Sequence, residues 1–263
     1  MRTPVKYLPD YANLPDDSGI RLHKVGIRGV YIKREWNDDF VVTRQSAYVS
    51  LYGKKGINMS RLAEKLLDWE FEPIDLDDTL LEELSLTHEG SDSYWKCRWK
   101  DIIDLSGPRM IVDLVLEGRY IYSQNIKQWY LSMTVPYASV CPCSMEMVKT
   151  VGRGVPHMQR SKAMLTVRLS QRVDLPEIVS DAVTDIADVV QLLPWMVMKR
   201  EDELTWCQKA AECPMFVEDV ARKLAQMVEE WQWIDDWVIV VEHEESIHEH
   251  NAVAVVWRGV ELR

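Results

Sequence analysis

The order of sequence patterns repeats once along this chain, and that repeat is the strongest constraint on its fold. Segments rich in β-branched and aromatic residues predict strands, and segments with apolar residues at helical spacing predict helices. In the first half, two strand patterns, two helix patterns and three further strand patterns lie at 23–36, 43–53, 60–69, 75–86, 93–103, 109–123 and 127–139.

The second half has a similar order. Segment 162–170 alternates as a strand, a long helix is predicted from about Pro176 with Asp174 as its N-cap, and a second helix is predicted at 216–231. Strand patterns at 237–245 and 252–260 close the chain. Each half is therefore roughly ββααββ, although no residue-level repeat accompanies the pattern.

This order predicts an α+β fold with an antiparallel sheet and helices on one face. We expect a flexible N-terminal segment over residues 1–20, a first half over 21–132 and a second half over 133–263, the two halves forming one integrated domain.

Composition excludes several classes of protein. No stretch of about 18 apolar residues is present to span a membrane, and the N-terminus lacks an apolar signal core. Five cysteines form an odd set, which favours a reducing, cytoplasmic compartment. A net charge of −11 disfavours nucleic acid as a partner.

Segment 139–161 gathers residues that bind metals. Cys141 and Cys143 are too close in sequence for a relaxed disulfide, and a lone Cys-x-Cys is more often a pair of small apolar residues than a metal motif. His157 strengthens the metal interpretation, because it precedes a strand in a segment rich in Gly and Pro, whose turns can bring it back towards Cys141.

Two further polar segments carry carboxylates and histidines. MKREDELTW at 198–206 fits a solvated charge run, and VEHEESIHEHN at 241–251 fits a surface turn equally well. Taken with 139–161, however, they supply thiolate, imidazole and carboxylate, the ligand types of a catalytic zinc or iron site with an open position for water. Such a site activates water at neutral pH.

Five blocks resemble those of the type IB GTP cyclohydrolases and occur in the same order. They are TVPYASVCPCS, GVPHMQRS, LPWMVMKREDE, ECPMFVEDVAR and EESIHEHNA, which cover about residues 133 to 252. In the first half the resemblance is faint and lies chiefly in KVGIRGV at 24–30. The resemblance implies a bimodular tunnelling fold and a homotetramer with active sites at subunit interfaces.

The resemblance also implies a site in which each residue has a role. Cys141, His157 and Glu203 correspond to ligands of a divalent metal, which is Fe²⁺, Zn²⁺ or Mn²⁺. Glu245 and His248 of the ESIH motif line the site and either complete the coordination or move protons. The neighbouring residues Cys143, Glu201 and His250 receive no settled role.

For the substrate, the resemblance implies that Glu218 of FVED anchors the guanine ring of GTP. The chemistry fits, because guanine N1–H and N2–H₂ present two parallel donors to one ionised carboxylate. The triphosphate requires cations. The local candidates are Lys199, Arg200 and Arg160, with Arg153 and Lys162 as further ones.

The implied reaction is hydrolytic opening of the guanine imidazole ring at C8, release of formate and reclosure to 7,8-dihydroneopterin triphosphate. Val155-Pro156 and Met158 around the histidine depart from the usual bacterial pattern and look more like the archaeal branch. That branch uses Fe²⁺ and makes a 2′,3′-cyclic phosphate, so metal and product stay open. The downstream pathway, folate biosynthesis or another use of the pterin, also stays open.

Two other classes of function compete with this one. A related tunnelling-fold nitrile reductase would use a cysteine nucleophile, but its expected Lys-rich motif is missing. A non-catalytic scaffold would use Cys141, His157 and Glu203 only to hold the fold. Structural zinc sites normally have four Cys or His ligands, which favours catalysis.

Overall fold

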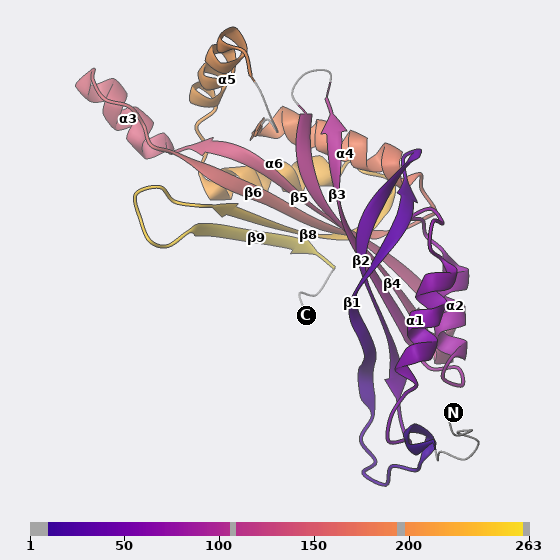
Figure 1. Ribbon diagram of the computed structural model, residues 1–263. Helices are drawn as coiled ribbons and strands as arrows, with labels where there is room; N and C mark the ends of the chain where they lie inside the picture. Colours follow the sequence, from indigo (N-terminus) through magenta and orange to yellow (C-terminus); the bar gives the residue numbers. More distant parts are fainter. Residues whose placement is uncertain (1–9, 106–108, 194–197, 260–263) are drawn as a thin grey trace, which may run out of the picture. The chain divides into compact units, whose positions relative to one another are not determined.

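The computed structural model describes residues 10–105, 109–193 and 198–259 (Figure 1). The chain divides into two compact units: the first runs to Arg98 and includes Glu117–Trp129, and the second comprises Trp99–Leu116 and the chain from Tyr130 onwards. No helix in the described part is long and apolar enough to cross a membrane.

The first unit follows the predicted order of strands and helices. Residues 1–9 of the predicted flexible segment lie outside the described residues, whereas Tyr11–Asn13 forms a short 3-10 helix. The elements that follow are β1 (Leu22–Trp36), β2 (Asp39–Leu51), α1 (Met59–Asp68), α2 (Asp78–Leu86), β3 (Ser93–Asp104) and β4 (Arg109–Ile121). The last two strands also contribute residues to the second unit.

The core of the first unit lies between its helices and one face of its sheet. Leu62 and Leu66 of α1 and Leu80 of α2 are fully buried, as are Ala47 and Val49 on alternate positions of β2. Asp77 caps α2 by accepting hydrogen bonds from the backbone N–H groups of its first turn. Because side chains alternate across a strand, the residues between these core positions point to the face that the helices leave open.

The second unit carries the remaining elements. They are most of β5 (Ile126–Val140), whose residues up to Trp129 belong to the first unit together with the short 3-10 helix Tyr122–Gln124, and then α3 (Pro142–Val151), β6 (Met158–Leu169), α4 (Leu175–Val189), β7 (Gln191–Leu192), α5 (Arg200–Glu212), α6 (Val217–Val228), β8 (Ile234–His243) and β9 (Ala252–Arg258). The hydrogen-bonded strand order is β1-β2-β3-β4-β5-β6-β8-β9, with β7 paired to β5. The fold is thus a mixed α/β fold with an antiparallel sheet, as predicted.

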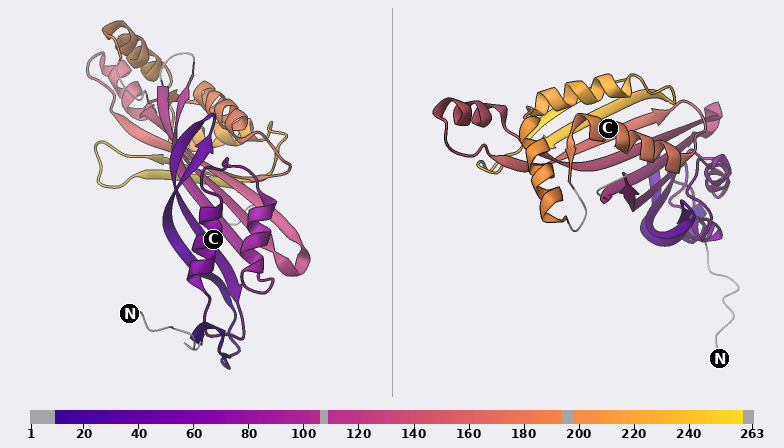
Figure 2. Two further views of the ribbon diagram at one scale, coloured as in Figure 1. Left: turned by 45° about the vertical axis from the view of Figure 1, so that its right-hand side comes forward. Right: turned by 90° about the horizontal axis from the view of Figure 1, so that it is seen from above.

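Helices α4 and α6 cover one face of the second unit's sheet (Figure 2). Val183 and Ile186 of α4 and Leu224 of α6 are fully buried, and Ile239 and Val241 of β8 are buried with them. Burying one such side chain stabilises the fold by about 1.5–3 kcal/mol. This layer fixes the positions of β5, β6 and β8, which carry the candidate site.

Two helices lie where the sequence predicted none. Helix α3 replaces the loop expected between Cys143 and His157, and α5 replaces the charge run that begins at Lys199. The described part of α3 buries no residue and α5 buries only Ala210, so neither has the apolar periodicity that announces a helix. Residues 194–197 of the LPWMVMKREDE block and Val260 of the last predicted strand lie outside the described residues.

Candidate active site

Cys141 and His157 meet just beyond the last pair of two antiparallel strands. β5 and β6 are paired as far as Val140 opposite Met158, and one step further the Cys141 N–H donates to the His157 carbonyl over 3.3 Å. Facing residues in such a ladder have Cα atoms about 4.5–5.5 Å apart. Strand register therefore brings together two residues that are sixteen positions apart in the sequence.

Helix α3 forms the excursion between these two residues and extends beyond the ends of β5 and β6 (Figure 1). Cys141 is its N-cap, Pro142 occupies its first turn, and Gly152 ends it in the left-handed region with φ 74°. The Ser144 hydroxyl accepts from the His157 N–H at 3.2 Å and donates to the Cys141 carbonyl at 3.1 Å. The first turn of α3 thus ties the two candidate ligands together.

Two neighbours orient the His157 ring. Its Nδ1 lies 3.1 Å from Gln159 Oε1 and 3.9 Å from Glu245 Oε2, and the side chains of His157 and Glu245 are only 18% and 15% exposed. An amide oxygen only accepts, so this contact assigns the hydrogen to Nδ1. The lone pair on Nε2 then remains for a ligand, as in metal-binding histidines whose other nitrogen is held by an acceptor.

The described residues contain no group of three or more His, Cys, Asp or Glu side chains that could hold a metal ion. Cys141 is a half-buried free thiol, and Cys143 is exposed on α3. Glu203 lies in the acidic first turn of α5, exposed, with its N–H bonded to the Lys199 carbonyl at 2.9 Å. Within the described residues, the backbones of Cys141 and His157 are therefore paired, but Glu203 forms no metal-binding group with them.

The ESIH motif lies in the connection between β8 and β9. The Glu244 N–H donates to the Arg160 carbonyl over 2.9 Å, which extends the pairing with β6 past His243 and brings Glu245 to His157. His248 is exposed and stacks on His250, with ring centroids 5.1 Å apart. Glu245 therefore lies beside His157, whereas the ring of His248 contacts the ring of His250.

A row of buried polar side chains continues inward from this pair along β5, β6 and β8. We call these residues the polar strip: Tyr137, Ser139, Gln159, Ser161 and His243. The hydroxyls of Ser139 and Ser161 are 2.8 Å apart, and Tyr137 Oη lies 2.8 Å from His243 Nε2. Strand pairing sets these contacts, because Tyr137 and His243 both lie opposite Ser161.

Burial controls the protonation of the polar strip. It lowers the pKa of His243 to about 4, and the charge of Glu218 opposes this shift. Burial also raises the pKa of Tyr137, with an opposing effect of a hydrogen bond to Ser161. His243 is therefore a neutral imidazole and Tyr137 a neutral phenol at physiological pH.

Glu218 lies at the other end of the polar strip. It is exposed in the first turn of α6, where a negative charge suits the positive end of the helix dipole. Its negative charge opposes the lowering of the His243 pKa, so the two groups interact electrostatically. The polar strip therefore links the neighbourhood of Glu218 to the Cys141 and His157 pair within one unit.

The predicted phosphate-binding residues lie on α5 and β6 of the second unit. Lys199 is the N-cap of α5, Arg200 is its first residue, and Arg160 lies on β6. All three are exposed, and within the described ranges none forms an ion pair. Lys162, by contrast, is paired with Glu244, whose hydrogen bond raises the pKa of the lysine.

The sequence interpretation missed most of the polar strip. The sequence predicts a strand from Lys162, yet β6 begins at Met158, four positions earlier. Gln159 and Ser161 occupy the same alternate positions as the buried Ala163 and Leu165. Extending the period of two backwards along the strand would have found them.

Comparison with known proteins identifies the family of the chain. Residues 8–254 match the family described as type I GTP cyclohydrolase FolE2. The chain belongs to this family. The GTP cyclohydrolase FolE2 of Syntrophus aciditrophicus (strain SB) is 29% identical over 258 residues, which cover 94% of this chain and 98% of that protein.

Another FolE2 relative, from Cereibacter sphaeroides (strain ATCC 17029 / ATH 2.4.9), is 30% identical over 263 residues, covering 92% of this chain and 69% of the relative. Among solved structures, a hyper-thermostable uricase matches with a TM-score of 0.53 at 6% identity, covering 92% of this chain and 94% of that one. That match supports the fold alone, whereas the FolE2 family match covers the residues of the candidate site.

Proposed function

We propose that this FolE2-family chain hydrolyses GTP to 7,8-dihydroneopterin triphosphate and formate at the Cys141 and His157 end of the polar strip. Membership of the family carries the GTP cyclohydrolase activity. The location rests on one observation, the meeting of Cys141 and His157 beside Glu245 at the end of a buried polar row that leads towards Glu218.

The donor set fits a divalent metal ion, which we propose to be Fe²⁺, Zn²⁺ or Mn²⁺. Cys141 offers a half-buried thiol, and the contact of His157 Nδ1 with Gln159 leaves Nε2 for a ligand. Glu203 completes the set when α5 packs in the assembled protein. When bound, the ion supplies a Lewis acid that lowers the pKa of water and polarises the reacting carbon.

Glu218 anchors the guanine ring of GTP. Its carboxylate accepts from N1–H and N2–H₂ in a bidentate, charge-assisted contact, which a basic residue could not make. Its exposed position at the start of α6 leaves both oxygens accessible to a ligand. The polar strip beneath then faces the ring with neutral groups that do not compete for this carboxylate.

Glu245 moves the protons of ring opening. Its Oε2 lies 3.9 Å from His157 Nδ1, so its carboxylate stands beside one of the two proposed ligands. We assign it to take a proton from the water that adds to C8 and to return the proton to the ring nitrogen released when the C8–N bond breaks. His248 on the adjoining turn serves as the second acid-base group.

The triphosphate is held by exposed cations around the site. Arg200 and Arg160 suit bidentate phosphate contacts because a guanidinium presents a planar fork, and Lys199 adds a point charge. None of these three forms an ion pair in the part of the chain that is described. Their charges are therefore available to an anionic substrate.

We propose further that the chain has a tunnelling fold and works as a homotetramer. β1 and β9 end the hydrogen-bonded strand order, and β9 exposes Val253, Val255 and Trp257 on one face. Exposed apolar edge strands are surfaces that partners cover. Assembly would also bury α3 and α5, which have almost no buried side chain within one chain.

The activity test uses purified apo-protein and GTP. Each of Fe²⁺, Mn²⁺ and Zn²⁺ is added in turn under anaerobic conditions, with formate measured directly and the pterin measured by fluorescence after oxidation. We expect formate and pterin in equal amounts with at least one metal. Absence of formate with all three would reject the proposed reaction, and the product mass distinguishes the triphosphate from the cyclic phosphate.

A further inference from the structure

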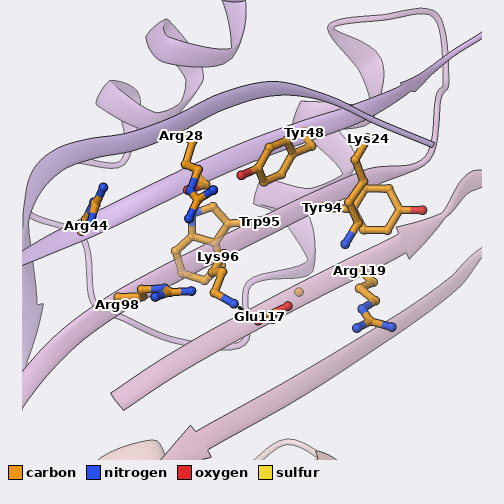
Figure 3. A pocket seen from close by; sticks show the side chains of 12 residues that line it. Lys24, Arg28, Arg44, Tyr48, Tyr94, Trp95, Lys96, Arg98, Glu117 and Arg119 are labelled. Atoms are coloured by element: carbon orange, nitrogen blue, oxygen red, sulfur yellow. Dashed lines mark hydrogen bonds and ion pairs between the residues drawn. The ribbon is translucent and has the colours of Figure 1, made fainter. Parts of the chain in front are cut away.

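The first unit contains a cavity of about 290 Å³ that the candidate active site does not use. It opens on the face of the sheet away from the core side that α1 and α2 cover, and we call it the basic pocket (Figure 3). Six cationic side chains line it: Lys24, Arg28, Arg44, Lys96, Arg98 and Arg119.

Strand register gathers these cations. Arg28 pairs with Ser46, and Ser46 pairs with Lys96, so β1, β2 and β3 present a row of neighbours across the sheet. Arg44 lies opposite Arg98 in the next row. All of them occupy the alternate positions to the buried core residues, which explains why they share the open face. Figure 3 shows the ends of Arg28, Lys96 and Arg98 directed towards a common region.

The backbone is shaped to accommodate two of these arginines. β1 has a register shift between Arg28 and Val30, and Gly29 inside it has φ 82°, where glycine is favoured. A Cβ at Gly29 would lie 3.2 Å from the Arg44 guanidinium. Bulges of this kind re-aim a side chain and occur often beside functional sites. The bulge lies in KVGIRGV, the motif of the first half that the proposed function leaves unexplained.

Positive charge in the basic pocket exceeds negative charge. Glu117 is the single carboxylate among the described lining residues, and it is paired with Lys96. Arg28, Arg44 and Arg98 form no ion pair with any carboxylate in the described part of the chain. Burial, and then the nearby Arg119 guanidinium, lower the pKa of Lys24, against an opposing effect of Glu117.

Holding these cations together without carboxylate partners is unfavourable. It is also unexpected in a protein of net charge −11, which has more carboxylates than basic side chains. Like charges held together at a partly desolvated surface repel one another, and an anion removes that repulsion. Guanidinium forks bind the oxygens of phosphate in bidentate contacts. The volume lies near the lower end of the range of about 300–1,000 Å³ found for small-molecule sites, which suits a compact anion.

We infer that the basic pocket binds a small anion with several phosphate groups. The anion is a free inorganic polyphosphate or the phosphate tail of a nucleotide, since both present the same oxygens to the arginines. The pocket's lining residues all belong to the first unit, whereas the residues assigned to catalysis all belong to the second. It does not depend on the proposed function.

Calorimetric titration of the full chain with inorganic tripolyphosphate, in metal-free buffer, tests the inference. We expect saturable binding that weakens with added salt, and Arg28→Gln and Arg98→Gln should each weaken it by about tenfold or more. Lys100→Gln is the matched control, because Lys100 lies two positions beyond Arg98 on the same face of β3 but outside the pocket and pairs with Asp113. Equal binding by all three variants, or no binding by the wild type, would overturn it.

Two further experiments show where the anion binds and which anion it is. In the unmodified protein, tripolyphosphate should slow acetylation of Lys24 relative to Lys149, an exposed lysine of α3, as read by mass spectrometry. GTP should displace tripolyphosphate if nucleotides use the pocket, guanosine should not, and failure of GTP to displace it assigns the pocket to inorganic polyphosphate. Binding abolished by Lys199→Gln with Arg200→Gln, but kept in Arg28→Gln, would place the anion at the candidate active site and refute the inference.

This binding assay is independent of turnover. Glu218→Gln should bind tripolyphosphate as the wild type does, whatever its cyclohydrolase activity. A protein that releases formate but binds no tripolyphosphate refutes the pocket alone, and a protein that binds it without releasing formate refutes the proposed reaction alone.

Discussion

At the scale of single residues, Gln159 determines what His157 can do. An imidazole has two nitrogens, and a fixed acceptor at Nδ1 decides which of them keeps a lone pair. Gln159 supplies that acceptor at 3.1 Å from a buried position on the adjoining strand, and the Glu245 carboxylate stands 3.9 Å from the same nitrogen. His157 and Gln159 are two positions apart at the start of β6. Side chains alternate across a strand, so both lie on the same face of the sheet.

The proposed roles of Cys141 and Glu218 can be separated by substitution. Cys141→Ser should lower the metal content of the purified protein at least tenfold, because a hydroxyl is a far weaker ligand than a thiolate for zinc or iron. Glu218→Gln should keep the metal and weaken GTP binding by about tenfold or more, through loss of the charge-assisted contact. Metal analysis and equilibrium GTP binding measure the two effects.

Matched controls for both substitutions exist elsewhere in the second unit. Cys207→Ser removes an exposed thiol from α5 and should leave the metal content unchanged. Glu230→Gln removes an exposed carboxylate just after α6 and should leave GTP binding unchanged. Loss of metal in Glu218→Gln would contradict the division of roles.

His243 makes the stability depend on pH. Its folded pKa of about 4 lies below the ordinary value of 6.5, so between these values the unfolded chain binds a proton that the folded one does not. The contribution of neutral His243 to the free energy of unfolding is therefore complete above pH 6.5 and is lost as the pH falls towards 4. The free energy of unfolding changes by up to about 1.4 kcal/mol per pH unit in this range.

Urea unfolding at pH 7, 6 and 5 measures this dependence, and His243→Gln isolates it because glutamine does not titrate. The wild type should lose more free energy of unfolding between pH 7 and 5 than the variant does. If the free energy of unfolding changes with pH to the same extent in both proteins, His243 binds its proton as readily in the folded state as in the unfolded one.

At the scale of elements, a close approach of backbones fixes the pairing of β1 with β2. Gly26 lies opposite Tyr48, and a Cβ at Gly26 would stand 2.0 Å from the Ala47 carbonyl oxygen. No side chain fits at that distance without moving one strand. The same pairing positions Arg28 at the basic pocket. The close approach at Gly26 therefore also affects where this cation lies.

Gly26→Ala should therefore destabilise the protein by about 2 kcal/mol or more, as expected when a buried backbone contact is overpacked. Gly56→Ala is the matched control, because a Cβ there would meet its nearest neighbour at an ordinary 3.7 Å. Chemical denaturation compares the two variants. Equal free energies of unfolding would show that β1 shifts to accept the methyl group at no cost.

At the scale of the whole molecule, the surface left by one chain indicates assembly. The exposed row on β9 and the unburied helices α3 and α5 belong to the unit that holds the candidate active site. The described part of one chain pairs the backbones of Cys141 and His157 but contains no group of three or more side chains that could hold a metal ion. An assembled protein would cover these surfaces and complete the site in the same step.

Sedimentation should accordingly show a homotetramer, and Val255→Asp with Trp257→Asp should shift it to smaller species by placing charges in an apolar contact. Cyclohydrolase activity should fall with the tetramer fraction. Leu86→Asp is the control, because Leu86 is an exposed apolar residue on α2 in the first unit. A monomeric wild type with full activity would contradict the proposed assembly.

The sequence by itself determined the order of the buried elements, and its resemblance to a known family predicted the site residues. Burial against a sheet leaves a period of two or 3.6 in the sequence, so β1 to β4, α1, α2, α4 and α6 were predictable. The five ordered blocks pointed to Cys141, His157, Glu218 and Glu245 through resemblance. Helices α3 and α5 escaped prediction because they bury almost nothing and leave no such period.

Only the tertiary structure decided which of these residues meet. Contacts between strands depend on register, and register follows from packing over the whole sheet rather than from any local pattern. It placed Cys141 opposite His157, aligned Tyr137 and His243 with Ser161, and gathered cations from β1, β2, β3 and β4 into the basic pocket. Those cations are spread over about a hundred positions, so no stretch of sequence displays them as a cluster.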